Sequence, residues 1–443
     1  MLSRSLSILK HTDKNRETCF LFGNRRKECF LYRKESIQCC VLKGEYMKQR
    51  LQMQYNFLHI LFWLISCSLN GFVAIYLKNK GLDNTLIGVV TGSSCVLITF
   101  VSPMVTNYVQ SHEHITIPKM MDVLMAVSAV FFLVISFLPV PSMALIGIYV
   151  ANLTMFLCAV PLLSTIAMNY NARGIDLNFG LSRGLGSISY AASAVVLSLL
   201  VEWLNPNWLS VVYAISALTF LILVNTLPDY QEEKSQTQKS GSIASVIVKY
   251  RTLFFILLGW SFAFAGSTSL STYLINVVEN LGGNTTVYGF AIFAMAASEM
   301  PAMAVTRKLM RRFDAMPLIL VSGICYIFRN ILVALAPNLM ILFVGMMFQS
   351  VTYGLLTSVL TYYVADICEK DDQVMGQTLI GMMTTGIGSM MGNVLGGILQ
   401  DMFGLNAMLL FVTFSTLLGI VIMVTVCIIQ IRRNENKHPA VNA

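Results

Sequence analysis

The sequence predicts an all-α membrane protein with twelve transmembrane helices, arranged as two six-helix bundles. Hydrophobic residues make up 56% of the chain and charged residues only 12%, with a mean hydropathy of +0.68. A soluble domain, by contrast, has about 25% charged residues. Apolar stretches of about 20 residues, the length that crosses a bilayer, occur twelve times. One polar segment divides these stretches into six and six.

Each expected transmembrane helix is an apolar stretch between polar or turn-forming residues. We place these spans at residues 53–77, 85–108, 118–138, 142–168, 180–203, 207–227, 251–278, 286–306, 316–336, 338–365, 374–400 and 405–431. The loops between most of them are short, so that almost the whole chain is expected to lie in or next to the lipid bilayer.

The net charge of +8 follows from the distribution of basic residues between the loops. Even-numbered loops carry most of them, and the odd loops carry little beyond Lys78 and Lys80. This positive-inside bias predicts that both termini lie in the cytoplasm. Topology explains the basicity, so no nucleic-acid partner is expected. The residues that establish the bias are Lys119, Arg173, Lys234, Lys239, Lys249, Arg307, Lys308, Arg311 and Arg312, with Arg432, Arg433 and Lys437 in the tail.

Residues 1–52 form an N-terminal segment before the first span, without the apolar core or cleavage site of a signal peptide. The codons of Lys43-Gly44-Glu45 can contain a purine-rich bacterial ribosome-binding sequence, and Met47 follows at a suitable distance. We therefore expect a bacterial protein whose translation starts at Met47, with residues 1–46 an annotation artefact. The alternative is a translated, disordered basic tail. No function is assigned to this segment in either case.

The polar stretch PDYQEEKSQTQKSGS, residues 228–242, begins the expected cytoplasmic linker of residues 228–250. Its Glu, Lys, Gln and Ser content is typical of a flexible segment. It separates an N-terminal six-helix bundle, residues 53–227, from a C-terminal bundle, residues 251–431, which is followed by a cytoplasmic tail, residues 432–443. The fifth and eleventh spans resemble one another, because each opens on FG or MG, carries a Gly-Ser pair and ends at an acidic residue. The chain therefore reads as two parallel repeats.

An arginine interrupts the fifth span, FGLSRGLGSISYAASAVVLSLL. Holding the guanidinium of Arg183 near a bilayer centre costs at least ~2.5–3.5 kcal/mol on insertion scales, so a function is expected. Tyr190 lies seven residues later, about two helical turns, and shares the face of Arg183. Gly180, Gly184 and Ala191 form a separate stripe, which we expect to allow close helix packing. The ladder of Gly388, Gly392 and Gly396 in the eleventh span predicts the same.

The segment FGLSRGLGSISY, residues 179–190, resembles the lactose permease-like branch of the major facilitator superfamily. This branch contains oligosaccharide and nucleoside symporters driven by protons, and the resemblance extends over about residues 53–430. In the family the arginine forks onto substrate hydroxyls, and the aromatic residue stacks on the sugar ring. The resemblance therefore implies that Arg183 and Tyr190 bind substrate. A planar guanidinium beside an aromatic ring also suits recognition of a polyol.

Further family segments place two ionisable residues inside the membrane. The segment ASEMPAM of the eighth span contains Glu299, and GICYIFRNIL of the ninth contains Arg329. The tenth span departs from the family pattern. In the family this span has a histidine, and in lactose permease it also has a glutamate that carries the proton, whereas this chain has QSVTYG, residues 349–354. Gln349 replaces the histidine and Thr352 the glutamate. We include Gln349 and Tyr353 among the expected substrate-binding residues.

Glu299 is the best remaining proton carrier, and we expect it to pair with Arg329. Their backbones differ in depth by roughly 8 Å at ~1.5 Å per residue, within the reach of two long side chains. Burial favours a neutral carboxyl, whereas a nearby arginine favours a carboxylate. A movement of Arg329 would therefore alter how tightly Glu299 holds a proton. The alternative is a static ion pair that fixes the eighth and ninth spans.

Other polar residues have simpler interpretations. We expect His59 to be a hydrogen-bonded packing residue, and Trp63 and Trp260 to line a cavity or face lipid. Span-end acids, among them Glu202, Glu279 and Asp401, are expected to be satisfied by water or headgroups. The cysteines follow no metal-ligand or disulfide spacing. No nucleophile–base pair, metal cluster or nucleotide-binding motif occurs, so we expect neither an enzyme nor a bound cofactor or metal.

These observations predict a secondary active transporter, a monomer in a bacterial inner membrane. Its expected function is proton-coupled import of a sugar, oligosaccharide or nucleoside by alternating access. One alternative is an uncoupled facilitator of the same fold, and another is a drug-efflux facilitator. The third is a membrane receptor that does not transport.

Overall fold

The computed structural model describes residues 47–112, 114–228, 243–369 and 372–437. Within these ranges the regular elements are all helices. Residues 1–46, most of the expected linker and residues 438–443 lie outside them, and with them the expectation of a translation start at Met47.

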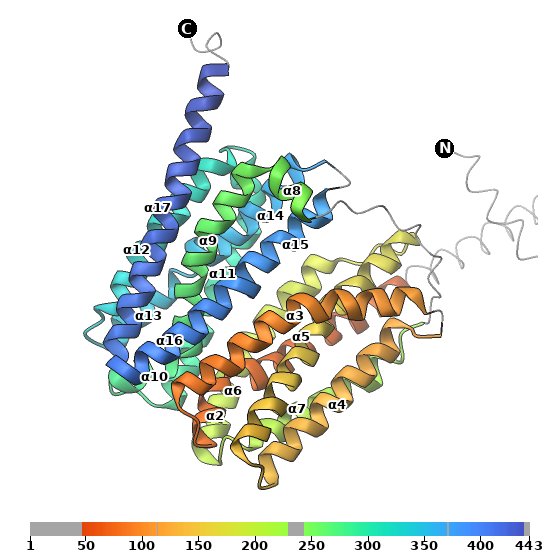
Figure 1. The fold of residues 1–443 in the computed structure, drawn as a ribbon. Helices are drawn as coiled ribbons and strands as arrows, with labels where there is room; N and C mark the ends of the chain where they lie inside the picture. The colour runs from red at the N-terminus through yellow and green to blue at the C-terminus, as the bar shows by residue number, and fades with distance from the viewer. Residues whose placement is uncertain (1–46, 113, 229–242, 370–371, 438–443) are drawn as a thin grey trace, which may run out of the picture. The chain divides into compact units, whose positions relative to one another are not determined.

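The first half of the chain contains six of the expected spans. Its first helix, residues 47–66, continues through the π-helical segment η2 (Cys67–Gly71) and bends by 47° into α2 (Val73–Asn79). The remaining helices are α3 (Asn84–Ser111), α4 (Ile117–Phe137), α5 (Ser142–Ala172), α6 (Phe179–Trp203) and α7 (Trp208–Val224). Figure 1 shows α3, α4, α5 and α7 packed together as one group, in orange to yellow-green.

The second half begins with a short helix, α8 (Ile243–Lys249), and contains the other six expected spans. Three of these spans are interrupted, because a helix break or a π-helical segment divides each of them. The elements are α9 (Arg251–Thr272), α10 (Leu274–Asn280), α11 (Thr285–Met310), α12 (Ala315–Ala334), α13 (Leu339–Met347), η3 (Ser350–Gly354), α14 (Leu355–Ile367), α15 (Gln373–Gly381), η4 (Met382–Gly388), α16 (Ser389–Phe403) and α17 (Leu405–Lys437).

All twelve expected spans coincide with helical segments. In the described residues, nine helices are long and apolar enough to cross a membrane, and the bent first helix makes ten. The two others are α7, which has only 17 residues, and the α15–η4–α16 segment. Glycine and polar side chains in this last segment lower its hydropathy, and they also form contacts described below.

Side-chain caps fix several helix starts. Asp83 accepts a hydrogen bond from the Leu86 amide at 2.8 Å and begins α3. Asn178 does the same for α6, accepting from the Leu181 amide at 3.0 Å. Such caps satisfy amides that have no partner within the helix. The cap at Asn178 also sets the start of the helix that carries Arg183.

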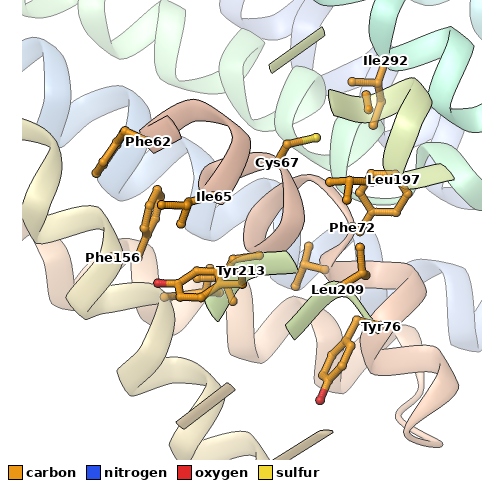
Figure 2. Close-up of a cluster of buried hydrophobic side chains, with 14 of the residues drawn as sticks. Phe62, Ile65, Cys67, Phe72, Tyr76, Phe156, Leu197, Leu209, Tyr213 and Ile292 are labelled. Atoms are coloured by element: carbon orange, nitrogen blue, oxygen red, sulfur yellow. The ribbon is translucent and has the colours of Figure 1, made fainter. Parts of the chain in front are cut away.

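Aromatic and aliphatic side chains fill the interior of the first half, and the second half contributes to the same cluster (Figure 2). Phe62 stacks on Phe156 with ring centroids 4.8 Å apart. Ile292, from α11, belongs to the same buried cluster as Leu197 of α6. The two halves are therefore joined partly by apolar packing between α6 and α11.

Glycines allow the closest helix contacts. The predicted ladder is confirmed, because a Cβ added to Gly388, Gly392 or Gly396 would lie within 2.8 Å of α9 atoms. The predicted stripe on the fifth span is wrong at its two glycines, whereas Ala191 is buried. Among the described residues, no atom of another helix lies within 4 Å of a Cβ added to Gly180 or Gly184. The packing glycine of α6 is Gly186, described below.

Outside the expected spans, Lys249 at the end of α8 bridges two acids of the turn before α15. Its Nζ lies 2.8 Å from Glu369 Oε2 and 2.8 Å from Asp372 Oδ2. The hydrogen bond from Lys249 lowers the pKa of Asp372 below its usual value, since it favours the charged carboxylate. This contact fixes the end of the inter-bundle linker to the second half.

Candidate functional site

Arg183 is the fifth residue of α6, is half-buried, and has its guanidinium held by two contacts. Its Nη1 donates a hydrogen bond to Ser187 Oγ at 2.7 Å, one turn along the helix. Its central carbon lies 3.9 Å from the ring centroid of Trp63, in the first helix. This is a cation–π contact, and it fixes the plane of the guanidinium.

Tyr190 lies two turns from Arg183 on α6, as the spacing predicts. Its ring meets Trp63 edge-on, with centroids 6.3 Å apart. A Cβ added to Gly71 would come within 2.9 Å of the Tyr190 hydroxyl. The tyrosine therefore lies against the π-helical segment η2, and Arg183, Trp63 and Tyr190 form one wall of polar and aromatic groups.

His59 lies one turn before Trp63 and is 2% exposed. Its ring packs edge-on against Tyr55 at 4.8 Å and Phe179 at 5.8 Å. Neither ring nitrogen has a hydrogen-bond partner among the described residues. The expected packing is present, but the expected hydrogen bond is absent from the described part of the chain.

Glu299, on α11 of the second half, is half-buried, and its carboxylate is held by Gln349. The Gln349 Nε2 donates to Glu299 Oε1 at 3.1 Å, and the glutamine is 5% exposed. The backbone of α11 lies directly on the π-helical segment η3, since a Cβ on Gly354 would be 3.2 Å from the Glu299 carbonyl oxygen. Gln349, expected to bind substrate, thus contacts the expected proton carrier.

Arg329, on α12, is fully buried. Its Nη1 donates to Ser267 Oγ on α9 at 3.3 Å. Its Nε and Nη2 find no hydrogen-bond partner in the described ranges, where no ion pair joins it to Glu299 either. A direct Glu299–Arg329 pair stays a prediction.

The two halves present these residues to one another. Arg183 lies on α6, which packs on α11, and α11 in turn packs on η3, so Glu299 and Tyr353 lie across the boundary between the halves from Arg183. Tyr353 is half-buried in η3, with its ring 5.9 Å from Phe264. The structure therefore brings the predicted binding residues of α6 close to those of α11 and η3. Their roles remain predictions.

At one end of the helices, polar contacts connect the halves. Asp401, at the end of α16, accepts from the Thr85 amide at 2.6 Å and from Asn84 Nδ2 at 2.7 Å. Lys78 donates to Asn276 and lies 3.5 Å from Glu279. We call this group, Lys78, Asn84, Asn276 and Asp401, the joined end.

The expectation that water or headgroups alone satisfy the span-end acids is therefore wrong for three residues. Asp401 and Glu279 bind groups of the first half. Glu202 accepts from Asn284 Nδ2 of the second half at 3.2 Å. Each of these acids contacts a residue of the opposite half. Predicting spans one segment at a time does not reveal contacts of this kind.

The described part of the chain contains no group of three His, Cys, Asp or Glu residues placed to hold a metal ion. The candidate site has two sides. Arg183, Trp63 and Tyr190 of the first half supply a guanidinium and aromatic rings. The second half supplies the carboxylate of Glu299, the amide of Gln349 and the phenol of Tyr353. Such a set can bind a polar solute by hydrogen bonds and ring stacking.

Comparison with known families decides the assignment. Residues 52–429 match the sequence model described as the MFS_1 like family. The chain belongs to this family. Membership confirms the resemblance to the major facilitator superfamily and the predicted all-helical membrane fold. The superfamily consists of transporters, which also confirms that the chain is not an enzyme.

Among curated proteins, similar sequences include two from bacilli. The maltose permease of Geobacillus stearothermophilus is 23% identical over 264 residues, covering 60% of this chain and 66% of the permease. The uncharacterized transporter YwbF of Bacillus subtilis (strain 168) is 21% identical over 280 residues, covering 63% of this chain and 68% of YwbF.

Solved structures share the fold at low sequence identity. The nucleoside transporter NupG superposes with a TM-score of 0.70 and 18% identity, covering 84% of this chain and 98% of NupG. A bacterial homologue of the lysosomal transporter Spinster, inward-facing and unoccupied, has a TM-score of 0.61 and 13% identity, covering 86% of this chain and 95% of the homologue. The chain is therefore a multi-pass membrane protein of the major facilitator fold.

Proposed function

We propose that this protein transports a small polyhydroxylated solute, a sugar, oligosaccharide or nucleoside, by alternating access. The observation that supports this most is the placement of Arg183 against Trp63, on the helix α6 that packs on α11, which carries Glu299 in the other half. A guanidinium and an aromatic ring match vicinal hydroxyls and a sugar ring. The maltose permease and NupG are named for solutes of these two classes.

Binding residues on both halves suit alternating access, because a solute between them links the two bundles. In this fold, one bundle rocks against the other around a site near the membrane centre. The joined end closes one side of that site, so transport requires its contacts to part. We propose that this side is extracellular and that both termini are cytoplasmic, as the loop charges indicate. We also propose that the protein is a monomer in a bacterial inner membrane.

Proton-coupled import is the favoured form of the proposal, with Glu299 as the proton carrier. Arg329 supports it, because its Nε and Nη2 groups have no partner among the described residues and offer a second position for the carboxylate. In the present structure Glu299 instead accepts from Gln349. A change of partner between amide and guanidinium would change the affinity of Glu299 for a proton.

The uncoupled facilitator is the second candidate, and one observation favours it. The tenth span offers neither a histidine nor a glutamate, and Glu299 is not paired with an arginine in the described residues. Replacing Glu299→Gln separates the two. Coupled import predicts loss of accumulation against a gradient while exchange of solute across the membrane continues. Unchanged accumulation would contradict the coupled form.

The decisive test adds maltose, lactose and uridine in turn to proteoliposomes, while external pH and solute uptake are recorded. Uptake with alkalinisation supports import with protons, and uptake alone supports the facilitator. Uptake of amphiphilic drugs but of none of these solutes would support efflux instead. Binding without flux would support a receptor.

Arg183→Lys tests the binding site itself. Lysine keeps the charge but loses the planar fork that reaches two hydroxyls, so we expect at least a tenfold loss of uptake with normal membrane insertion. The matched control is Arg307→Lys, an exposed residue near the end of α11. Uptake at the wild-type rate by Arg183→Lys would exclude the binding role.

The proposed domain boundaries follow the sequence prediction, with bundles at residues 53–227 and 251–431 joined by the linker of residues 228–250. The helices of the described ranges end and begin within a few residues of these limits. Fusing a periplasmic reporter enzyme to the C-terminus would test the orientation, because activity there would contradict a cytoplasmic tail.

A further inference from the structure

Trp63 is one of the two tryptophans for which the sequence allows either a cavity-lining or a lipid-facing position, and the structure places it against the expected binding residues Arg183 and Tyr190. It lies on the first helix, whereas Arg183 and Tyr190 lie on α6. Its ring contacts both, at 3.9 Å from the guanidinium carbon and 6.3 Å from the Tyr190 ring centroid. Trp63 thus links the first helix to both residues.

A glycine of α6 makes room for this ring. A Cβ on Gly186 would lie 2.2 Å from Trp63 Cδ1 and 2.9 Å from Trp63 Nε1, closer than any real Cβ contact. Gly186 is one turn beyond Arg183 and one turn before Tyr190. The indole therefore lies directly on the α6 backbone, between the two binding residues.

The position of the indole decides which part of Arg183 a solute can reach. The indole of Trp63 contacts the guanidinium at 3.9 Å and Ser187 engages Nη1 at 2.7 Å, so the other N–H groups of Arg183 are the donors left for a solute. Donors at the edge of a guanidinium bind two neighbouring oxygens at once. Trp63 thus presets Arg183 for a pair of adjacent hydroxyls.

The indole N–H has a role of its own. Trp63 Nε1 is buried and has no hydrogen-bond partner among the described residues. Buried donors without a partner are rare in proteins and call for a specific explanation. The N–H belongs to a ring that lies among binding residues, so an oxygen atom of a bound solute can accept from it.

We propose that Trp63 is a substrate-binding residue, which donates its indole N–H to a solute oxygen and orients Arg183 toward a vicinal diol. The inference rests on the proposed function, because it concerns the same site and the same class of solute. It also predicts the substrate specificity of the site. Rings with a vicinal diol and a nearby acceptor oxygen should bind more tightly than solutes with isolated hydroxyls.

The test compares variants by binding of maltose and of uridine to the purified protein in nanodiscs. Trp63→Phe retains an aromatic ring but removes the N–H, so we expect about a tenfold weaker Kd, the effect of one lost hydrogen bond. Gly186→Ala displaces the indole without changing it, and we expect a similar loss. The matched control is Trp260→Phe, because Trp260 is also buried, on α9, with an unpartnered Nε1. Its Kd is expected to match wild type.

A second measurement reports on contact directly. The chain has four tryptophans, so replacing Trp203, Trp208 and Trp260 by Phe leaves Trp63 as the only one. Its emission should change with added solute and saturate at the measured Kd, which a purely structural role does not require.

The outcomes distinguish a failure of the proposed role of Trp63 from a failure of the proposed transport function. Binding by wild type and equally by Trp63→Phe and Gly186→Ala overturns the role of Trp63 and leaves the proposed function standing. Emission that is unaffected by a bound solute also overturns it. If wild type binds neither maltose nor uridine, both the proposed substrate classes and this inference fail together.

Discussion

At the scale of single residues, the contact between Gln349 and Glu299 determines how the carboxylate can act. The amide donates to Glu299 Oε1 at 3.1 Å, while the Gln349 Oε1 atom has no partner in the described ranges. In the described ranges, Nε and Nη2 of Arg329, on α12, have no hydrogen-bond partner. Glu299 therefore has one partner in the present state and a competing partner nearby, which is the arrangement expected of a residue that exchanges contacts during a cycle.

Gln349→Leu removes the donor at similar volume. We expect it to reduce uphill accumulation of solute about tenfold, the effect of a hydrogen bond to a charged group, and to affect exchange less. Uptake and exchange in proteoliposomes measure both. Gln400→Leu is the matched control, because Gln400 is a partly buried amide at the end of α16 that does not contact Glu299. Equal effects of the two substitutions would show that Gln349 is merely a packing residue.

The sequence predicts individual residues of the site better than their partners. Arg183 and Tyr190 share a face of one helix, so the seven-residue spacing suffices to place them together. Trp63 could not be assigned, because its orientation depends on the missing Cβ of Gly186 in another helix. For the same reason the sequence does not predict the partner of Gln349, because a contact between α11 and the turn before η3 leaves no periodic signal in either segment.

At the scale of elements, α3 begins with two carboxylates. Asp83 of its own turn caps the Leu86 amide, and Asp401 from α16 accepts from the amides of Asn84 and Thr85. Carboxylates at a helix N-terminus are stabilised by free amides and by the helix dipole. The end of α16 therefore completes the first turn of α3, and parting the halves exposes that turn.

Asp401→Asn tests this shared cap. The amide retains one acceptor oxygen but loses the charge and the second acceptor, so we expect the joined end to weaken by about 1 kcal/mol. Amide hydrogen exchange of residues 84–86 should then accelerate about fivefold. Asp122→Asn is the control, because Asp122 contacts Asn225 within the first half. Unchanged exchange in Asp401→Asn would show that the contact between the halves does not protect this turn.

At the scale of the whole molecule, hydropathy and charge predict the helices because lipid imposes length and composition on every span. All twelve spans and the all-helical class follow from that constraint. The contacts between the halves do not, since the residues that form the joined end are ordinary turn and span-end residues in sequence. Their pairing depends on how the two bundles pack against each other, and a single sequence without an alignment does not predict that packing.

Alternating access makes a prediction about the joined end as a unit. Asn84 and Asp401 belong to opposite halves and are hydrogen-bonded at 2.7 Å, so Asn84→Cys with Asp401→Cys allows a short bis-thiol reagent to bridge the halves. We expect the bridge to abolish uptake in proteoliposomes and a reductant to restore it. The matched pair is Asp122→Cys with Asn225→Cys, which replaces an Asn–Asp contact of 2.9 Å inside one half. That bridge leaves the halves free to move and should not reduce uptake. If the bridge between the halves leaves uptake unchanged, the joined end does not part during transport, and solute must cross by a route that keeps Asn84 and Asp401 together.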